Sequence, residues 1–223
     1  MKVFLSHVLE ESTPSYGNRD KFGFTPNSII KNGYGANTSS WTFTNNHLGT
    51  HLDTPNHFYE DGKKTEDYSA RDFFFEKVFL VELVLESGTL IDVGDLETKN
   101  IPEDTELLII KTHYEKFRSI EKYHNDNPGI HMNVASYLKG KHKNLKAIGF
   151  DFISLTSWNY RDHGKLSHKE FLGEPQSLLI VEDMHLKPLN EKSKIEWVII
   201  APLRTKDGNG SPVTIIAELN EKY

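Results

Sequence analysis

Histidines and one aspartate are concentrated in the segment HLGTHLDTPNH, residues 47–57. The chain has 223 residues and 11 histidines, and three of these, His47, His51 and His57, lie here together with Asp53. Imidazole nitrogens and carboxylate oxygens are ligands that zinc, manganese and iron accept in proteins. The segment therefore predicts a metal site, and hydrolysis is the chemistry that such a site most often serves.

The spacing of these residues also predicts a local backbone shape. On a helix His47 and His51 would share a face that excludes Asp53. On a strand all three would share a face, but the two histidines would be about 13 Å apart, too far for both to form bonds of about 2 Å to one ion. We therefore expect a turn at Gly49, an extended run to Asp53, and no helix continuing through Pro55. The alternative is a polar loop with solvated histidines.

Composition excludes several classes of protein and of site. There are no cysteines, so disulfides and thiolate ligands are excluded. The net charge is −6 and no basic block stands out, so we expect no nucleic-acid partner. We read no secretory signal and no apolar run long enough for a bilayer, and therefore expect a cytoplasmic protein without a membrane partner.

Short apolar runs dominate the chain, and their length and their content of Val, Ile, Leu and Phe are typical of buried strands. They lie at residues 3–5, 78–85, 107–110, 147–150, 177–181, 197–202 and 213–219. Helices are predicted at 69–75, 131–138 and 168–172, the last with Ser167 as its N-cap. The pattern predicts one α+β domain over residues 1–223 with a mixed, barrel-like sheet. Residues 14–46 read as a long loop or arm.

The 47–57 segment resembles the signature motif of the cyclase family, whose members include the bacterial kynurenine formamidases. Further segments resemble this family in the same order along the chain. They are FLSHVL at 4–9, IGFD at 148–151, SHKEFL at 167–172, LIVEDM at 179–184 and the closing APL at 201–203 with GNGSPV at 208–213. The resemblance implies the swivelling β/β/α fold of that family, with a barrel-like sheet and few helices.

The resemblance also implies a role for each matching residue. The metal ligands would be His47, His51, Asp53, His168 and Glu182. Asp53 would bridge to a second ion, and His57 would be the general acid/base. The cofactor would be one or two Zn²⁺ ions, with Mn²⁺ possible, since both accept imidazole and carboxylate ligands.

Several of these assignments have alternatives. His57 could be a further ligand, His168 a residue at a helix start, and Glu182 a solvated strand end. His113, after the 107–110 strand, could reach the pocket from a loop. Trp41 and Phe24, with Tyr16, could form an aromatic substrate wall, although bulky aromatics are more often core.

The resemblance implies a metal-dependent amide hydrolase that acts on a small formamide of the N-formylkynurenine type through a metal-activated water. A hydrolase of an isatin-like cyclic amide and a non-catalytic metal-binding protein are the alternatives. The chain departs from the family near Ser154 and at Thr214, and residues 157–166 read as a pocket loop of its own. These departures leave the substrate open. A homodimer or homotetramer is expected, with segment 14–46 exchanged across the interface.

Overall fold

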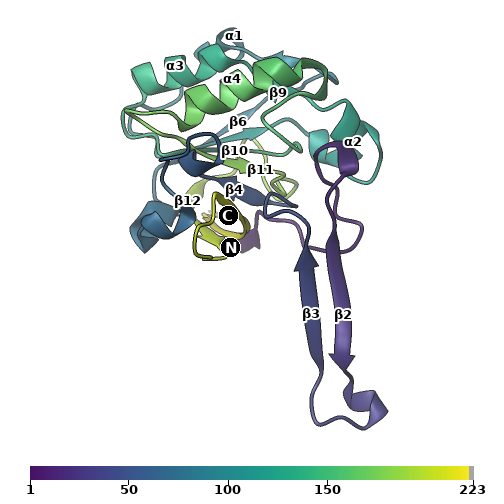
Figure 1. Cartoon of the computed structure of the whole chain (residues 1–223). Coiled ribbons are helices and arrows are strands. Elements are labelled where there is room, and N and C mark those ends of the chain that lie inside the picture. The colour runs from purple at the N-terminus through teal and green to yellow at the C-terminus, as the bar shows by residue number, and fades with distance from the viewer. Residues whose placement is uncertain (221–223) are drawn as a thin grey trace.

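The computed structural model describes residues 1–220 and places nine of their strands in one sheet. These strands are β1 (Lys2–Phe4), β4 (His51–Asp53), β5 (Phe74–Phe75), β6 (Val78–Glu82), β8 (Leu107–Lys111), β10 (Ala147–Phe150), β11 (Leu179–Glu182), β12 (Ile195–Pro202) and β13 (Gly210–Leu219). Their order is β5-β12-β13-β4-β11-β10-β8-β6, and β1 pairs with β13 (Figure 1).

The sheet has a parallel half and an antiparallel half that meet at β4. Strands β6, β8, β10 and β11 are parallel neighbours. Strand β4 is antiparallel to both β11 and β13, and β12 continues the antiparallel half. Because β12 also packs against β6 at the other end of the order, the sheet curls into a nearly closed barrel. The mixed, barrel-like sheet and the α+β class expected from the sequence are confirmed.

Helices cover one face of this sheet (Figure 1). The described residues form α1 (Val93–Glu97), α2 (Lys122–Asn125), α3 (Met132–Lys141) and α4 (Arg161–Leu172), and β7 (Leu90–Ile91) pairs with β9 (Gly129–Ile130) beside them. Helices α3 and α4 pack side by side. Short 3-10 turns lie at Tyr16–Asn18, Ile30–Asn32, Pro55–His57, Thr65–Asp67, Ala70–Phe73, Tyr114–Phe117 and Trp158–Tyr160. In the described part of the chain, no helix is long and apolar enough to cross a membrane.

Two apolar cores lie on opposite faces of the sheet. Ile148 and Phe171 belong to the core beneath the helices, and Leu52 and Ile215 belong to the core enclosed by the antiparallel half. Strands with both faces covered can be apolar at every position. This is why the central strands read as continuous apolar runs rather than as alternating ones.

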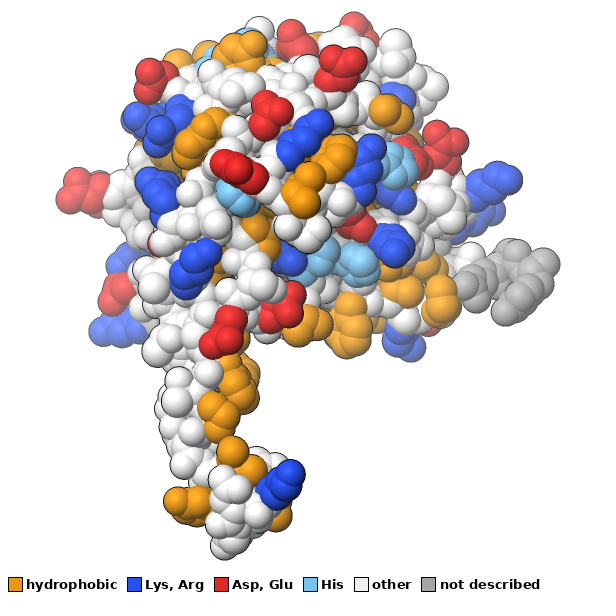
Figure 2. All heavy atoms as spheres, turned by 90° about the vertical axis from the view of Figure 1, so that its right-hand side faces the viewer, with side chains coloured by type: hydrophobic (Ala, Val, Ile, Leu, Met, Phe, Trp, Pro, Cys, Tyr) orange, Lys and Arg blue, Asp and Glu red, His pale blue; other side chains and the backbone are white. Residues whose placement is uncertain are grey.

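Part of the segment expected as a long loop or arm is a β-hairpin that extends away from the body (Figures 1 and 2). Its strands are β2 (Phe22–Ser28) and β3 (Thr38–Phe43), and we call this hairpin the arm. The strands are rich in Thr, Phe and Trp, which favour extended backbone. The arm is therefore a regular element, and the loop interpretation of residues 22–43 is wrong.

Helix α4 is longer than the sequence predicted. It begins at Arg161, so Ser167 lies inside it and donates its hydroxyl to the carbonyl of Ile130 at 2.8 Å instead of capping a helix. Gly164 reads as a helix breaker, but a Cβ there would lie 2.3 Å from Thr156, so the glycine permits close packing. Residues 157–166 are accordingly a 3-10 turn and half of a helix rather than a pocket loop.

Candidate metal centre

Strand β4 presents His51 and Asp53 on one face, because residues two apart on a strand point the same way. Glu182 of β11 lies directly opposite His51 in the antiparallel register, so its side chain shares that face. Gly49 has φ 68°, a left-handed conformation that glycine adopts easily. The predicted turn at Gly49, followed by an extended run to Asp53, is confirmed.

Two imidazoles alternate with two carboxylates around the centre of this buried cluster. His51 Nε2 lies 3.5 Å from Asp53 Oδ1 and 3.4 Å from Glu182 Oε2. His168, from α4, places its Nε2 3.6 Å from Asp53 Oδ2 and 3.4 Å from Glu182 Oε1. Residues from three separate stretches of chain thus converge, and the structure brings Asp53 to His168 and Glu182 as the sequence analysis expected.

Backbone carbonyls fix the orientation of both imidazoles. His51 Nδ1 lies 2.8 Å from the carbonyl oxygen of Gly49, and His168 Nδ1 lies 2.9 Å from that of Gly164. If Nδ1–H donates to each carbonyl, the Nε2 lone pair faces the carboxylates. Lone pairs and carboxylate oxygens are all acceptors, so a proton or a metal cation must lie between them.

His47 joins the cluster from the other side of Asp53. Its Nδ1 lies 2.7 Å from Asp53 Oδ1, and its Nε2 lies 3.0 Å from Oδ1 of Asn209, which also accepts from the Asn46 amide at 2.8 Å. Gly210 faces Asp53 across the β4–β13 pair, and a Cβ there would lie 2.3 Å from His47 Cε1. Asn209 and Gly210 were not singled out in the sequence, where they stand in the closing GNGSPV segment.

His57 ends the 3-10 turn Pro55–His57, and its ring stacks on that of His47 with centroids 3.9 Å apart. Two sets of candidate ligand atoms each lie within 4.8 Å of one another: His47, Asp53 and His57 form one set, and His51, Asp53 and Glu182 form the other. Asp53 belongs to both. The geometry thus accommodates a carboxylate that bridges two cations, and it leaves His57 able to act either as a ligand or as a free base.

Burial and charge act in opposite directions on these groups. Burial works to lower the pKa of His51, but Glu182 and Asp53 raise that pKa to about 9. Burial works to raise the pKa of Asp53, yet His47, His57 and His51 together hold that pKa well below its usual range. For His57 burial prevails and lowers the pKa to about 4, so this imidazole is neutral at pH 7. The two carboxylates therefore carry negative charge that a proton on His51 or a metal cation neutralises.

A cavity of about 200 Å³ lies over the cluster. The segment before the arm contributes Tyr16, Arg19 and Asp20 to its walls, and Phe58 stacks on the ring of His168 at 4.7 Å. Of the residues expected to form an aromatic wall, Tyr16 alone lines this cavity.

The other residues expected at the substrate site lie elsewhere. Trp41 and Phe24 are on the arm, 65% and 48% exposed, and neither lines the cavity. His113 follows β8 and pairs through Nε2 with the carboxylate of Glu82. Glu82 ends the parallel strand β6, which is the neighbour of β8. His113 therefore lies beside Glu82 and not at the cavity. Within one chain, the structure does not bring these three residues to the site.

Comparisons with known proteins agree with this geometry. The model of the Cyclase family matches residues 3–157. Kynurenine formamidase of Bacillus cereus is 28% identical over 181 residues, which cover 76% of this chain and 75% of that protein. Cyclase-like protein 2 of Arabidopsis thaliana is 25% identical over 219 residues, which cover 95% of this chain and 77% of that protein.

Solved structures show the same fold. Isatin hydrolase A from Labrenzia aggregata, bound to benzyl benzoate, superposes with a TM-score of 0.82 at 19% identity and covers 99% of this chain and 94% of its own. A potential metal-dependent hydrolase with cyclase activity superposes with a TM-score of 0.76 at 20% identity, covering 99% and 98%.

Proposed function

Since the chain belongs to the Cyclase family, we propose that it is a metal-dependent hydrolase of amide bonds. One observation carries the proposal: the Nε2 atoms of His51 and His168 face the carboxylates of Asp53 and Glu182 at 3.4–3.6 Å. These groups are buried, and an arrangement of facing acceptors is stable only with protons or a metal cation among them. The potential metal-dependent hydrolase of the same fold supports the metal. The hydrolase names of the relatives support amide hydrolysis as the reaction.

The ligands that we assign to the metal are His47, His51, Asp53, His168 and Glu182. Three imidazoles and two carboxylates without sulfur suit Zn²⁺ or Mn²⁺. When bound, a divalent cation would supply Lewis-acid activation of water and of the scissile carbonyl. The chain's own contribution is rigid positioning. Glu182 Oε1 accepts from the Leu155 N–H at 2.7 Å, and the two carbonyl contacts described above hold the histidine rings.

We assign proton transfer to His57. Its imidazole lines the cavity beside His47 and is neutral at pH 7, so it can take a proton from the attacking water and pass it to the leaving nitrogen. The variant His57→Ala should keep its metal content and lose roughly 10²- to 10⁴-fold in kcat. Loss of metal would show that His57 is a ligand instead, and full activity would reject the proton role. His113→Ala, outside the cavity, is the control.

A small formamide of the N-formylkynurenine type is the substrate class that we propose first. The support is the match to kynurenine formamidase over 76% of this chain. An isatin-like cyclic amide is the second candidate, favoured by the fold shared with isatin hydrolase A. Hydrolysis of N-formylkynurenine and of isatin should be compared before chelation, after chelation and after metal is restored. Hydrolysis that survives complete metal removal would reject the metal role.

The arm supports the proposal of a homodimer. Phe24 and Trp41 are exposed on it, and at its base an apolar groove of about 520 Å³ includes Phe4, Phe43 and Leu203. Exposed apolar surface of this kind is typical of protein–protein contacts. Light scattering should give a dimer or tetramer for the parent and a smaller species for Trp41→Ser with Phe24→Ser. A monomeric parent would reject the exchange of arms.

A further inference from the structure

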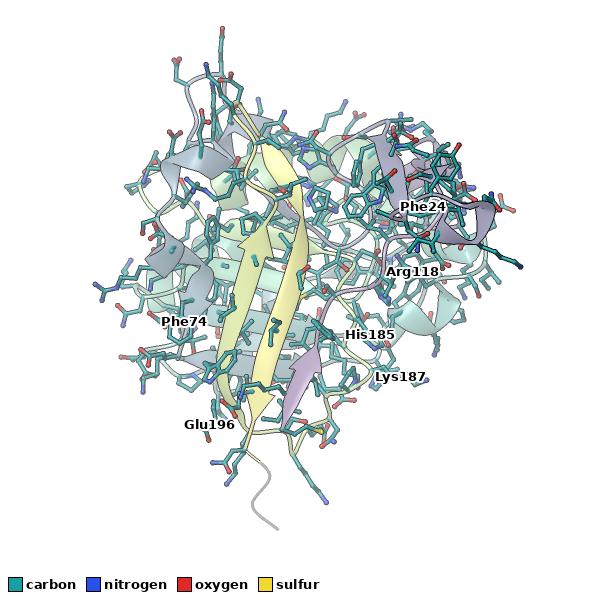
Figure 3. All side chains as sticks on the ribbon, turned by 90° about the horizontal axis from the view of Figure 1, so that it is seen from below. Phe24, Phe74, Arg118, His185, Lys187 and Glu196 are labelled. Carbon is teal, nitrogen blue, oxygen red and sulfur yellow. The ribbon has the colours of Figure 1, made fainter. Side chains whose placement is uncertain are left out.

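A second group of ligand-type side chains lies outside the cavity. His7 follows β1, Glu115 lies in the 3-10 turn Tyr114–Phe117, and His185 follows β11. One ligand atom from each of these residues lies within 4.8 Å of the other two. Figure 3 shows His185 on the side of the molecule where β1 ends, together with Arg118 and Lys187. Three segments far apart in the sequence therefore meet at one place.

The side chains of this group face one another. The rings of His7 and His185 have centroids 5.0 Å apart, and Glu115 Oε1 lies 3.6 Å from His185 Nδ1. The other oxygen of Glu115 accepts from the Leu186 N–H at 2.5 Å, which fixes the carboxylate. A separation of 3.6 Å is too long for a hydrogen bond, so Glu115 and His185 are close but not hydrogen-bonded to each other.

Two ring nitrogens of the group are buried without a hydrogen-bond partner among residues 1–220, namely His7 Nε2 and His185 Nδ1. A buried polar atom left unpaired destabilises a protein by about 1–3 kcal/mol. Two such atoms in one group with a carboxylate suggest a missing shared partner rather than two separate defects. A cation placed among the three side chains would contact all of them.

The backbone holds these segments together independently of any ion. The N–H of His185 donates to the carbonyl of Leu5 at 3.0 Å, and Ser6 forms a β-bridge with Met184. The N–H of His7 donates to Thr50 Oγ1 at 2.9 Å. The ligand positions are therefore preorganised, which lowers the entropy lost when an ion binds.

The charges near the group are mixed: burial raises the pKa of Glu115, and Lys111, Lys187 and Arg118 place positive charge nearby. Arg118 lies beside the group, but the buried carboxylate of Asp183 binds its guanidinium through two nitrogens, at 2.8 and 2.9 Å. Asp183 Oδ1 also lies 4.0 Å from His7 Nε2. Burial lowers the pKa of His7 to about 4 and, with the charges of Lys187 and Arg118, lowers the pKa of His185. Both imidazoles are therefore neutral, as metal ligands must be.

We propose that His7, Glu115 and His185 bind a divalent transition-metal ion of the zinc type, separate from the catalytic centre. Two imidazoles and one carboxylate suit zinc, cobalt or nickel rather than calcium or magnesium. Solvent completes the coordination, because the three side chains are 12–32% exposed. The ion fastens the segment after β1 to the segment after β11, and so stabilises the fold as a crosslink between distant parts of the chain.

Zinc stoichiometry tests this site separately from the catalytic one. The full chain is loaded with ZnCl₂, freed of excess by gel filtration and analysed for zinc per chain. Glu115→Gln retains an oxygen for the Leu186 N–H, so it should fold and yet bind one zinc fewer than the parent. His185→Ala should lose the same equivalent, and His163→Ala, outside both clusters, should lose none. Amide hydrolysis should be unchanged in all three.

A variant without the catalytic ligands tests zinc binding at the second site alone. The double variant Asp53→Ala with His168→Ala lacks the carboxylate common to both ligand sets of the catalytic cluster and should still bind one zinc, with a higher Tm when zinc is present. Adding Glu115→Gln should remove that one equivalent of bound zinc. Equal stoichiometry in the parent and in Glu115→Gln, or a double variant that folds and binds no zinc, would overturn the proposal. Neither result bears on whether the cavity hydrolyses amides.

Discussion

The proton on His51 should control how tightly the catalytic centre binds metal at different pH. In the metal-free protein Glu182 and Asp53 raise the pKa of His51 to about 9. At pH 7 the ring is therefore protonated, and a metal ion must displace that proton to reach Nε2. Metal affinity should rise with pH until about pH 9 and then level off. Glu182 and Asp53 also raise the pKa of His168, so its proton likewise weakens metal binding at lower pH.

The size of the effect follows from the pKa. Well below pH 9 each pH unit lowers the fraction of deprotonated His51 about tenfold, so affinity at pH 7 should be about 100-fold weaker than on the plateau above pH 9, or about 3 kcal/mol. The stability of the metal-free protein should change in the opposite sense. The pKa of His51 is higher in the folded protein than its unfolded value of 6.5, so protonated His51 stabilises the fold. This stabilisation is complete below pH 6.5 and is lost as the pH rises through about 9. This contribution is on the order of 3 kcal/mol.

Zinc titrations against a competing chelator between pH 6.5 and 9.5 would measure the first effect. Calorimetry in two buffers of different ionisation enthalpy would count the protons released. His51→Gln should reduce the slope of log affinity against pH by about one, whereas His113→Gln should leave it unchanged. An affinity that is flat between pH 7 and 9, with no proton release, would refute the reasoning.

Three other predictions concern the same chain. In Gly210→Ala the new Cβ would collide with His47, so kcat/KM should fall at least about tenfold with little loss of fold, whereas Gly140→Ala, with open space around its Cβ, should keep full activity. Asp183→Asn leaves the half-buried Arg118 without its counter-charge, and denaturant titration should show that the free energy of unfolding falls by about 3–5 kcal/mol. A fall below about 1 kcal/mol would contradict the importance of this pair. Chelation should lower Tm, because a ligand at 100 times its Kd stabilises the folded state by about 2.7 kcal/mol; an unchanged Tm would mean that the ion contributes little to folding.

The part of the candidate metal centre on β4 could be predicted because its information is local. His51, Asp53 and the Gly49 turn lie within five residues, and both strand periodicity and glycine conformation are properties of short segments. The barrel-like sheet could be predicted from apolar runs for the same reason. The positions of His168 and Glu182 came from the family resemblance, since no spacing rule links residues more than a hundred positions apart.

Other features depend on contacts that a single sequence does not reveal. Asn209 orients His47 from the far end of the chain. Its segment, GNGSPV, resembles the family, but the resemblance gave Asn209 itself no role in the site. His7, Glu115 and His185 have no motif spacing, so their proximity emerges only when the segments that follow β1 and β11 meet at the Ser6–Met184 bridge. Gly164 shows the converse: a residue that normally interrupts a helix is needed there because Thr156 leaves no room for a side chain.

The place of β4 between β11 and β13 has a consequence for the mobility of the chain. This three-residue strand is flanked on both sides, so His51 and Asp53 cannot fray as a loop or an edge strand would. Amide hydrogen exchange there should require global unfolding, while the tip of the arm exchanges rapidly. Variation in the arm and in the cavity walls can therefore accumulate over evolution, or be introduced by engineering, while the metal-holding scaffold stays in register.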